Sequence, residues 1–514
     1  IDIYMKQIFQ NISNGETYIE DIPLPTVKKG EILISTLYSV ISPGTEKSLI
    51  KFSKSSFFSK AAQQPDKVKE VIDKVKNDGP LSAMEAVKNR LNKPLELGYC
   101  NVGIVEEVGE GVLQFKKGDR VISNGPHSEY CCVPQNLCAK VPSNVSSEEA
   151  SFTVLASIGL QAIRLAKPTF GETFVVSGLG IIGLLTIQLL KANGCKVIGI
   201  DINSEKCKLA NKFGIESINL SEINNPVEYV HNLTEGDGVD GVLISATTKS
   251  DDPIHLACKL CRKRGRIILL GVTGLNFRRD LFYKKELTFQ VSCSYGPGRY
   301  DPFYEEKGND YPIGFVRWTE NRNFQSILNA FSQKSLNIYP LISKRLPFEK
   351  VLEGYEILNS NPDTLGILLE YKLNKKEKNK SRELIKSNLN NQSSNKLTVS
   401  VIGSGNHASR SLLPNLSNSG ALFDDFLGCN GEPLVRLGKK FKFSKVTTDK
   451  DLFFKDNKSN SIVIASRHDT HGAFIKEALK SNKNVFVEKP LCLTTKDLSE
   501  IKKLTSNSLL LMVG

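Results

Sequence analysis

Short apolar runs alternate with longer amphipathic stretches through the middle of the chain. Four such runs are Phe174–Ser177, Val197–Ile200, Val242–Ser245 and Ile267–Leu270. Runs of this length, separated by helical patterns, predict parallel strands joined by crossover helices. We therefore expect a doubly wound α/β domain over residues 151–294.

The preceding part of the chain has a different pattern. Residues 5–150 alternate apolar and polar positions between turns such as Lys117-Gly118, which predicts a β-rich barrel. A polar segment, Glu46–Arg90, interrupts this pattern, and the spacing of its apolar residues predicts a helix. Residues 295–371 are mixed, and we expect part of them to return to the β-rich domain.

A basic segment precedes a second α/β pattern. Residues 372–396 hold eight Lys and Arg residues against Glu377 and Glu383, and they are rich in Asn and Ser. This composition predicts a solvated linker. Residues 397–514 then repeat the alternation of strands and helices. Because the apolar run Leu509–Val513 is followed only by Gly514, we expect this second α/β domain to be C-terminally incomplete.

Length, charge and cysteine content narrow the class of protein. The 514 residues predict several domains, and the formal charge of +13 comes from widely spread lysines. We therefore expect neither nucleic-acid binding nor a membrane span. The eleven cysteines lack framework spacing, which is typical of a reducing, cytoplasmic environment. Cys258 and Cys261 have no second pair, so helix-face thiols are favoured over zinc there. The oligomeric state, including a homo-oligomer, stays open.

Two glycine-rich turns have the pattern of a dinucleotide fingerprint. The first contains Gly178, Gly180 and Gly183, and the second contains Gly403, Gly405, Asn406 and Ala408. Each lies between an apolar strand and a helix, where backbone N–H groups approach a pyrophosphate. The chain is therefore expected to bind two nicotinamide nucleotides.

The residue that closes the next strand indicates the cofactor. Asp201 stands 23 residues after Gly178, and a carboxylate there accepts hydrogen bonds from the adenosine ribose and repels a 2′-phosphate. We expect NAD(H) in the first α/β domain. No acid closes the corresponding strand after Gly403, where Cys429 is followed by Asn430, so NAD(H) and NADP(H) both stay open.

The segments Gly98–Gly111 and Gly118–Val121, followed by the first fingerprint, resemble the medium-chain dehydrogenase/reductase family. The resemblance implies a GroES-like catalytic domain at 5–150 and a Rossmann domain at 151–294. Members commonly bind a catalytic zinc through a Cys-Gly-Thr-Asp type motif and a Gly-His-Glu motif. Here Pro43 and Tyr99 occupy the Cys and His positions, so we expect no zinc.

Two hydroxyls stand at the matching positions. The resemblance implies that Thr45 is the proton-relay hydroxyl, and Tyr99 can donate a hydrogen bond at the former ligand position. The alternative interpretation is that both side chains only pack the barrel wall.

The second fingerprint is followed by loops that resemble the Gfo/Idh/MocA oxidoreductases, most of which act on sugars, cyclitols and nucleotide sugars. The matching residues are His471 and the run Glu488-Lys489-Pro490. We expect all four to lie at the cofactor, with Lys489 bonding the reacting oxygen or the nicotinamide ribose. The alternative for Lys489 is a solvated charge.

The order of the parts resembles a bi-domain oxidoreductase family in which a zinc-free medium-chain module precedes a Gfo/Idh/MocA module. The segments Ser292–Asp301 and Tyr311–Thr319 resemble its signature. The family often occurs with surface-polysaccharide assembly genes, which implies a sugar-like substrate. Tyr295, Arg299 and Tyr300 are candidates to bind it, or they form a structural turn. A non-catalytic dinucleotide-binding scaffold is the alternative function.

Overall fold

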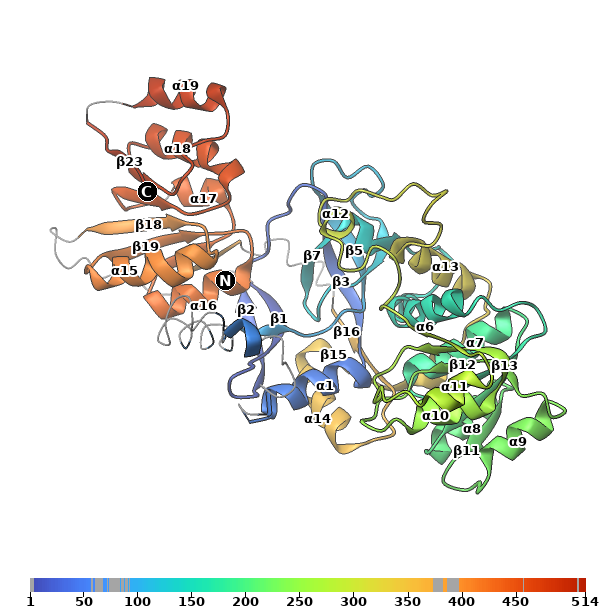
Figure 1. Ribbon diagram of the computed structural model, residues 1–514. Helices are drawn as coiled ribbons and strands as arrows, with labels where there is room; N and C mark the ends of the chain where they lie inside the picture. The colour runs from blue at the N-terminus through green and yellow to red at the C-terminus, as the bar shows by residue number, and fades with distance from the viewer. Residues whose placement is uncertain are drawn as a thin grey trace. The chain divides into compact units, whose positions relative to one another are not determined.

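Alternating strand patterns and amphipathic helices build two compact units in the computed structural model (Figure 1). One unit comprises Ile8–Ile19 and Lys29–Leu373, and the other comprises Ile1–Gln7, Glu20–Lys28 and Asn374–Gly514. The structure describes residues 4–56, 59–60, 68–71, 73, 84, 87, 91, 93–372, 382–385, 397–455, 457–505 and 508–514.

A long central strand organises the β-rich domain. β3 (Glu31–Ile41) pairs with β5 (Asn101–Val108), β7 (Tyr130–Pro134) and β16 (Gly366–Glu370), all antiparallel. Its seven-stranded sheet has the order β15-β16-β3-β5-β6-β8, with β7 on β3. The other strands of this part are β6 (Arg120–Ser123), β8 (Cys138–Lys140) and β15 (Ile342–Pro347), with β1 (Met5–Gln10), β2 (Thr17–Ile22) and β4 (Leu95–Glu96) in a separate sheet.

Two helices of this domain matter for the site. α1 (Pro43–Lys54) follows β3, and α14 (Val351–Ser360) lies between β15 and β16. Within the segment Glu46–Arg90, where the spacing of apolar residues predicts a helix, residues 68–71 are helical. Two of those apolar residues, Ile72 and Val75, lie outside the described residues. Further helices near this domain in the described ranges are α5 (Ser147–Ala150), α12 (Pro302–Glu305) and α13 (Glu320–Ser332).

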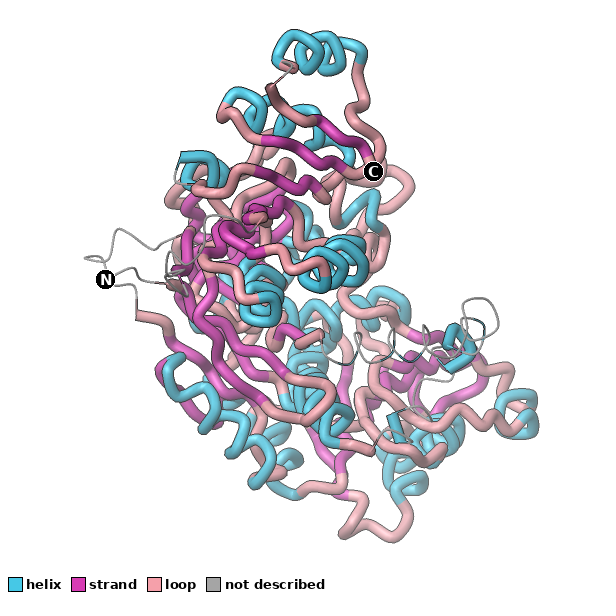
Figure 2. The backbone as a smooth tube through the Cα atoms, turned by 90° about the vertical axis from the view of Figure 1, so that its left-hand side faces the viewer, coloured by secondary structure: helices cyan, strands magenta, loops and turns pink. Residues whose placement is uncertain are grey.

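Six parallel strands form the first Rossmann sheet, in the order β11-β10-β9-β12-β13-β14. Side chains alternate between its faces: Phe174 and Val176 face one apolar cluster, which includes residues of α6, α7 and α8, while Val175 faces another, with residues of α9 and α10. Figure 2 shows these strands in magenta and the helices in cyan. The elements are β9 (Thr173–Ser177), β10 (Lys196–Asp201), β11 (Glu216–Asn219), β12 (Val239–Ile244), β13 (Cys261–Leu269), β14 (Thr288–Val291), α6 (Thr153–Ala166), α7 (Ile181–Ala192), α8 (Ser204–Lys212), α9 (Pro226–Leu233), α10 (Asp252–Leu260) and α11 (Arg279–Tyr283). Cys261 therefore begins a strand, and the predicted helix ends at Leu260.

The second Rossmann sheet has the order β17-β20-β19-β18-β21-β22-β23. β18 to β23 are parallel, and β17 (Glu383–Ile385) adds an antiparallel edge to β20. The expected linker thus contributes a strand. The elements are β18 (Thr398–Ile402), β19 (Leu422–Leu427), β20 (Lys445–Thr447), β21 (Ser461–Ile464), β22 (Asn484–Val487), β23 (Leu511–Val513), α15 (Leu413–Asn418), α16 (Gly431–Phe441), α17 (Lys450–Lys455), α18 (His471–Lys480) and α19 (Thr495–Leu504).

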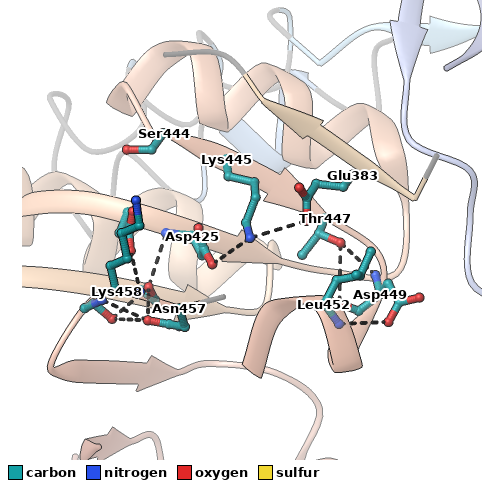
Figure 3. Close-up of polar contacts among 12 residues, drawn as sticks. Glu383, Asp425, Ser444, Lys445, Thr447, Asp449, Leu452, Asn457 and Lys458 are labelled. Atoms are coloured by element: carbon teal, nitrogen blue, oxygen red, sulfur yellow. Dashed lines mark hydrogen bonds and ion pairs between the residues drawn. The ribbon is translucent and has the colours of Figure 1, made fainter. Parts of the chain in front are cut away.

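A buried lysine joins the edge strand to the second sheet (Figure 3). The Lys445 ammonium lies 3.2 Å from an Asp425 carboxylate oxygen and 3.3 Å from one of Glu383. Burial, and next the neighbouring Asp424, raise the pKa of Asp425 to about 7. Because a buried cation without a partner is costly, the two carboxylates make this register of β17 specific.

The α/β architecture expected from the sequence, a β-rich barrel and two Rossmann-type parallel sheets, is confirmed. Among the described residues, every helix is either too short or too polar to cross a bilayer.

Candidate functional site

The first fingerprint folds into a turn that requires glycine twice. Gly178 follows β9 with φ of +96°, and a Cβ there would lie 2.6 Å from the Ala246 nitrogen. A Cβ on Gly183 would lie 1.9 Å from the Gly178 carbonyl oxygen. Gly180 caps α7 at its N-terminus and has no atom within 4 Å of an added Cβ. The open helix N-terminus fits a pyrophosphate.

Asp201 ends β10 beside this turn. Its carboxylate accepts hydrogen bonds from the Leu179 N–H at 2.6 Å and the Asn203 N–H at 2.9 Å. These bonds fix the carboxylate at the carboxyl edge of the sheet, next to the strand that carries the fingerprint. This is where a dinucleotide ribose is bound in Rossmann domains.

We expect Asp201→Asn to weaken NADH binding at the first site by about tenfold to a hundredfold, because a hydrogen bond to a charged group contributes about 1.5–3 kcal/mol. NADPH binding should weaken less, so the preference between the two nucleotides shrinks. Fluorescence titrations with both nucleotides check this, with the exposed Asp237→Asn as the control. An unchanged preference in Asp201→Asn would contradict the role of this carboxylate.

Two buried hydroxyls at the same edge lack partners among the described residues. They are Thr273 Oγ1, after β13, and Ser292 Oγ, after β14. The nicotinamide end of a dinucleotide lies beyond the carboxyl ends of these strands and carries an amide that can bond hydroxyls. The sequence names Ser292 only as the first residue of the signature segment and does not point to Thr273, because an isolated Thr or Ser carries no signal.

A hydroxyl pair lies on the β-rich domain of the same unit. The Tyr99 hydroxyl donates to Thr45 Oγ1 at 3.3 Å, with Thr45 exposed and Tyr99 partly buried. Burial raises the pKa of Tyr99, and the neighbouring Cys100 and Glu46 raise it further. A tyrosine held protonated in this way donates hydrogen bonds across the physiological pH range.

The signature loop places its candidate residues in different environments. Tyr295 is buried and Tyr300 is exposed, with the Arg299 guanidinium over both rings. Arg299 forms an ion pair with Glu305 at 2.6 Å, so one of its guanidinium nitrogens already has a partner. Asn124 donates to the Tyr295 hydroxyl at 3.3 Å.

A buried acid lies next to this loop and was not predicted from the sequence. Glu320 begins α13, is fully buried, and has no hydrogen-bond partner for either carboxyl oxygen among the described residues. Burial, and next the proximity of Glu305, raise its pKa to about 9. Glu320 is therefore neutral in the folded protein at pH 7.

This raised pKa predicts a pH-dependent stability. The acid titrates near pH 4.5 when unfolded and near 9 when folded, so its contribution to stability is lost as the pH rises between those values. Glu320→Gln should match the parent at pH 5 and exceed its Tm at pH 8.5 by more than about 4 °C, since each kcal/mol shifts Tm by roughly 2–4 °C. Thermal unfolding at both pH values tests this, with exposed Glu306→Gln as the control. Equal Tm values at pH 8.5 would exclude a neutral Glu320.

The second fingerprint forms a related turn with a different helix start. Gly403 follows β18 with φ of +109°, and a Cβ there would lie 2.4 Å from the Ala465 carbonyl oxygen. An added Cβ on Gly405 meets no atom within 4 Å. Asn406 begins the helix, and the buried Ala408 opens a π-helical turn, Ala408–Leu412. Ala408 stands at the position that corresponds to Gly183 of the first fingerprint. The helix after the second fingerprint therefore begins differently from α7 at this position.

The loops after β21 and β22 meet the second fingerprint. His407 lies 3.0 Å from a Glu488 carboxylate oxygen, which joins the fingerprint to the Glu488-Lys489-Pro490 run. His471 is fully buried, and its ring nitrogens face the carbonyl oxygens of Pro490 at 2.7 Å and Ser466 at 3.2 Å. The Lys489 side chain is exposed, and the Lys489–Pro490 peptide is cis. The structure thus brings Glu488 to the fingerprint, and it places the buried His471 in contact with the loops after both strands.

Three protein-family models match the chain. The alcohol dehydrogenase GroES-like domain matches residues 76–143, and zinc-binding dehydrogenase matches residues 182–306. The oxidoreductase family with an NAD-binding Rossmann fold, GFO_IDH_MocA, matches residues 397–514. The resemblances noted in the sequence are therefore confirmed for all three parts.

Curated relatives and solved structures agree with these matches. Human sorbitol dehydrogenase is 24% identical over 321 residues, which cover 56% of this chain and 83% of the relative. D-xylulose reductase of Scheffersomyces stipitis is 26% identical over 321 residues, covering 54% and 84%. The crystal structure of 2R,3R-butanediol dehydrogenase from Bacillus subtilis has a TM-score of 0.55 at 20% identity, covering 71% of this chain and 99% of that one. Galactitol-1-phosphate dehydrogenase from Escherichia coli gives the same values.

Among the described residues around Tyr99, few side chains are left to bind the zinc that one family model names. Near Tyr99 the thiol of Cys100 is fully buried, and burial raises its pKa far above the ordinary value. The Glu46 carboxylate already accepts three hydrogen bonds. Across the described ranges, no cluster of three or more His, Cys, Asp and Glu residues could hold a metal ion. Zinc sites need three or four such donors.

Proposed function

Because the chain joins a GroES-like and zinc-binding-dehydrogenase-type module to a Gfo/Idh/MocA-type NAD-binding Rossmann domain, we propose that it is an NAD(P)-dependent dehydrogenase or reductase. It interconverts a hydroxyl and a carbonyl group on a sugar or nucleotide-sugar-like metabolite. The observation that carries the proposal is the Thr45–Tyr99 hydroxyl pair, in the same unit as a fingerprint turn closed by Asp201. Relatives named for sorbitol and xylulose support a polyol or keto-sugar substrate.

The cofactors follow from the two turns. NAD(H) occupies the first Rossmann domain, where Asp201 meets the ribose, and NAD(H) or NADP(H) occupies the second, which has no acid at this position. When bound, the nicotinamide supplies or accepts the hydride. The protein binds the pyrophosphate at each helix N-terminus and manages one proton.

The medium-chain module works without zinc in this proposal. When the substrate binds, the single Tyr99 hydroxyl proton turns from Thr45 Oγ1 to the substrate oxygen, and Thr45 donates its own hydroxyl proton to the Tyr99 oxygen. In reduction Tyr99 gives its proton to the substrate oxygen and takes one from Thr45, whose exposed hydroxyl takes one from water; in oxidation the transfers run in reverse. Burial and nearby Cys100 and Glu46 hold Tyr99 in its protonated form, as this task requires. Tyr300 and the free edge of Arg299 contact the substrate, while the buried Tyr295 supports Arg299 from below.

In the second Rossmann domain, exposed Lys489 bonds the reacting oxygen or the nicotinamide ribose. Glu488 and Pro490 shape the loop that presents it, and His471 fixes the backbone of that loop. The resemblance to the bi-domain family supports a role in polysaccharide or glycan biosynthesis, and the lack of a cysteine framework spacing supports a cytoplasmic location.

NADH oxidation with a panel of keto-sugars, and NAD⁺ reduction with sorbitol, xylitol and butane-2,3-diol, tests the proposal. We expect turnover with at least one polyol–carbonyl pair, and we expect a chelator to leave it unchanged. Comparison of Lys489→Ala with the parent separates the contribution of the second domain. NADH binding without turnover across the panel would favour the alternative, a non-catalytic dinucleotide-binding scaffold. The presence of Pro43 and Tyr99 at the zinc-ligand positions supports that alternative.

A further inference from the structure

A buried polar cluster lies directly behind the hydroxyl pair. Its centre is Glu46, the residue after Thr45, whose carboxylate accepts from the Ser42 N–H at 2.9 Å, from His127 Nε2 at 3.1 Å and from the Tyr355 hydroxyl at 2.5 Å. Glu46 and His127 are both fully buried. Burying such a pair is costly unless its hydrogen bonds are satisfied, and here they are.

The cluster continues from the other side of the histidine ring. Ser39 Oγ lies 2.7 Å from His127 Nδ1 and 2.9 Å from the Tyr371 hydroxyl. If His127 donates from Nε2 to the carboxylate, then Nδ1 accepts from Ser39, and Ser39 accepts from Tyr371. In this arrangement Tyr371 donates to Ser39, Ser39 donates to His127, and His127 donates to Glu46. Each proton makes one hydrogen bond, and the chain of donors ends at the Glu46 carboxylate.

His127 also fixes the segment that carries Tyr99. Its backbone N–H donates to the Leu97 carbonyl oxygen at 2.7 Å. Gly98 adopts φ of +93°, and an added Cβ would lie 2.6 Å from His127 Cγ, so the ring packs directly against the chain before Tyr99. One residue thus bonds to Glu46 on α1 and packs against the Tyr99 segment.

We infer that Glu46 and His127 form a positioning pair that holds the Thr45 and Tyr99 hydroxyls within hydrogen-bonding distance. The inference rests on the proposed function and deepens it. Glu46 sets the start of α1 through the Ser42 N–H, and therefore the position of Thr45. His127 sets the Leu97–Tyr99 backbone. In a site whose donors do not fit zinc, this pair replaces the geometric control that a metal would exert on the substrate oxygen.

The experiment compares His127→Ala, His127→Gln and Glu46→Gln in the full chain. Gln can place an N–H near the position of His127 Nε2, so it restores the bond to Glu46. With a substrate found in the panel, His127→Ala should lower kcat by about a hundredfold, since a misplacement of about 1 Å costs that much. KM for NADH should change less than about threefold, and His127→Gln should recover at least about a tenth of the parental kcat.

A double-mutant cycle and a structural measurement complete the test. Because the two residues act as one unit, Glu46→Gln combined with His127→Ala should cost no more than the worse single change. The control is His231→Ala, a histidine on α9 whose ring nitrogens lie near two backbone carbonyl oxygens instead of Glu46 and Ser39. Additive losses, or full kcat in His127→Ala, would overturn the inference.

If no substrate is found, the proposed function lacks support, and crystal structures then test the positioning role of Glu46 and His127 by itself. The Tyr99–Thr45 oxygen separation, 3.3 Å in the parent, should exceed hydrogen-bonding distance in His127→Ala and return in His127→Gln. A hydroxyl pair that stays together in His127→Ala contradicts the inference whatever the reaction is. If His127→Ala does not fold, Glu46→Gln gives the same two readouts.

Discussion

Replacing Thr45 by valine or Tyr99 by phenylalanine should lower turnover by about 10²- to 10⁴-fold while NADH binding stays unchanged, because a positioned proton donor contributes that much to a proton transfer. Thr45→Val keeps the volume of the side chain and removes only its hydroxyl, and Tyr99→Phe does the same for the phenol. Neither hydroxyl belongs to a fingerprint turn, so the loss should appear in kcat with NADH affinity preserved.

The matched control for this prediction is Tyr229→Phe. Tyr229 also donates its hydroxyl to another side chain, Glu216, at 2.7 Å, but it lies on α9 of the Rossmann domain. Steady-state kinetics and NADH fluorescence titration measure the two quantities separately. Parental kcat in both Thr45→Val and Tyr99→Phe would show that these side chains only pack the barrel wall.

Gly180→Asp should abolish NADH binding at the first site and leave the fold intact. No atom lies within 4 Å of an added Cβ at this position, so the side chain is accommodated. Its carboxylate would then stand at the N-terminus of α7, in the place of the pyrophosphate. Two unit charges at about 4 Å repel by about 4 kcal/mol near a protein surface, which predicts a loss of more than about a hundredfold.

The second domain offers the matched variant. Gly405→Asp places the same charge in the same open position of the other turn, and it should abolish only the second site. Gly314→Asp, in an equally open position that belongs to neither fingerprint, controls for the added charge. Equal NADH affinity in Gly180→Asp and the parent would contradict the placement of the pyrophosphate.

The parts of the molecule that the sequence predicts are those defined by local pattern. A side chain on Gly183 would clash with the Gly178 carbonyl oxygen of the same βα unit, and one on Gly178 would clash with Ala246 after β12. Both glycines nevertheless follow the short local spacing of the fingerprint, and that spacing identifies them in the sequence. Asp201 ends the next strand, and its separation of 23 residues from Gly178 identifies it in the sequence. The fold class follows from the same local alternation of strands and helices.

The parts that the sequence does not predict depend on distant residues. Glu46, His127 and Tyr355 are brought together from three separate segments, and only the folded sheet sets their separation. His471 was expected at the cofactor, but its burial between two carbonyl oxygens depends on how the loops after β21 and β22 pack. Arg299 was expected to meet the substrate, and its bond to Glu305 depends on the turn that precedes α12.

If both glycine turns hold a nicotinamide nucleotide, calorimetric titration of the full chain with NADH measures this as a stoichiometry. We expect two molecules bound per chain, with one remaining in Gly180→Asp, one in Gly405→Asp and none in the double variant. A parent chain that binds no NADH and no NADPH, or whose stoichiometry is unchanged by both substitutions, would contradict this expectation.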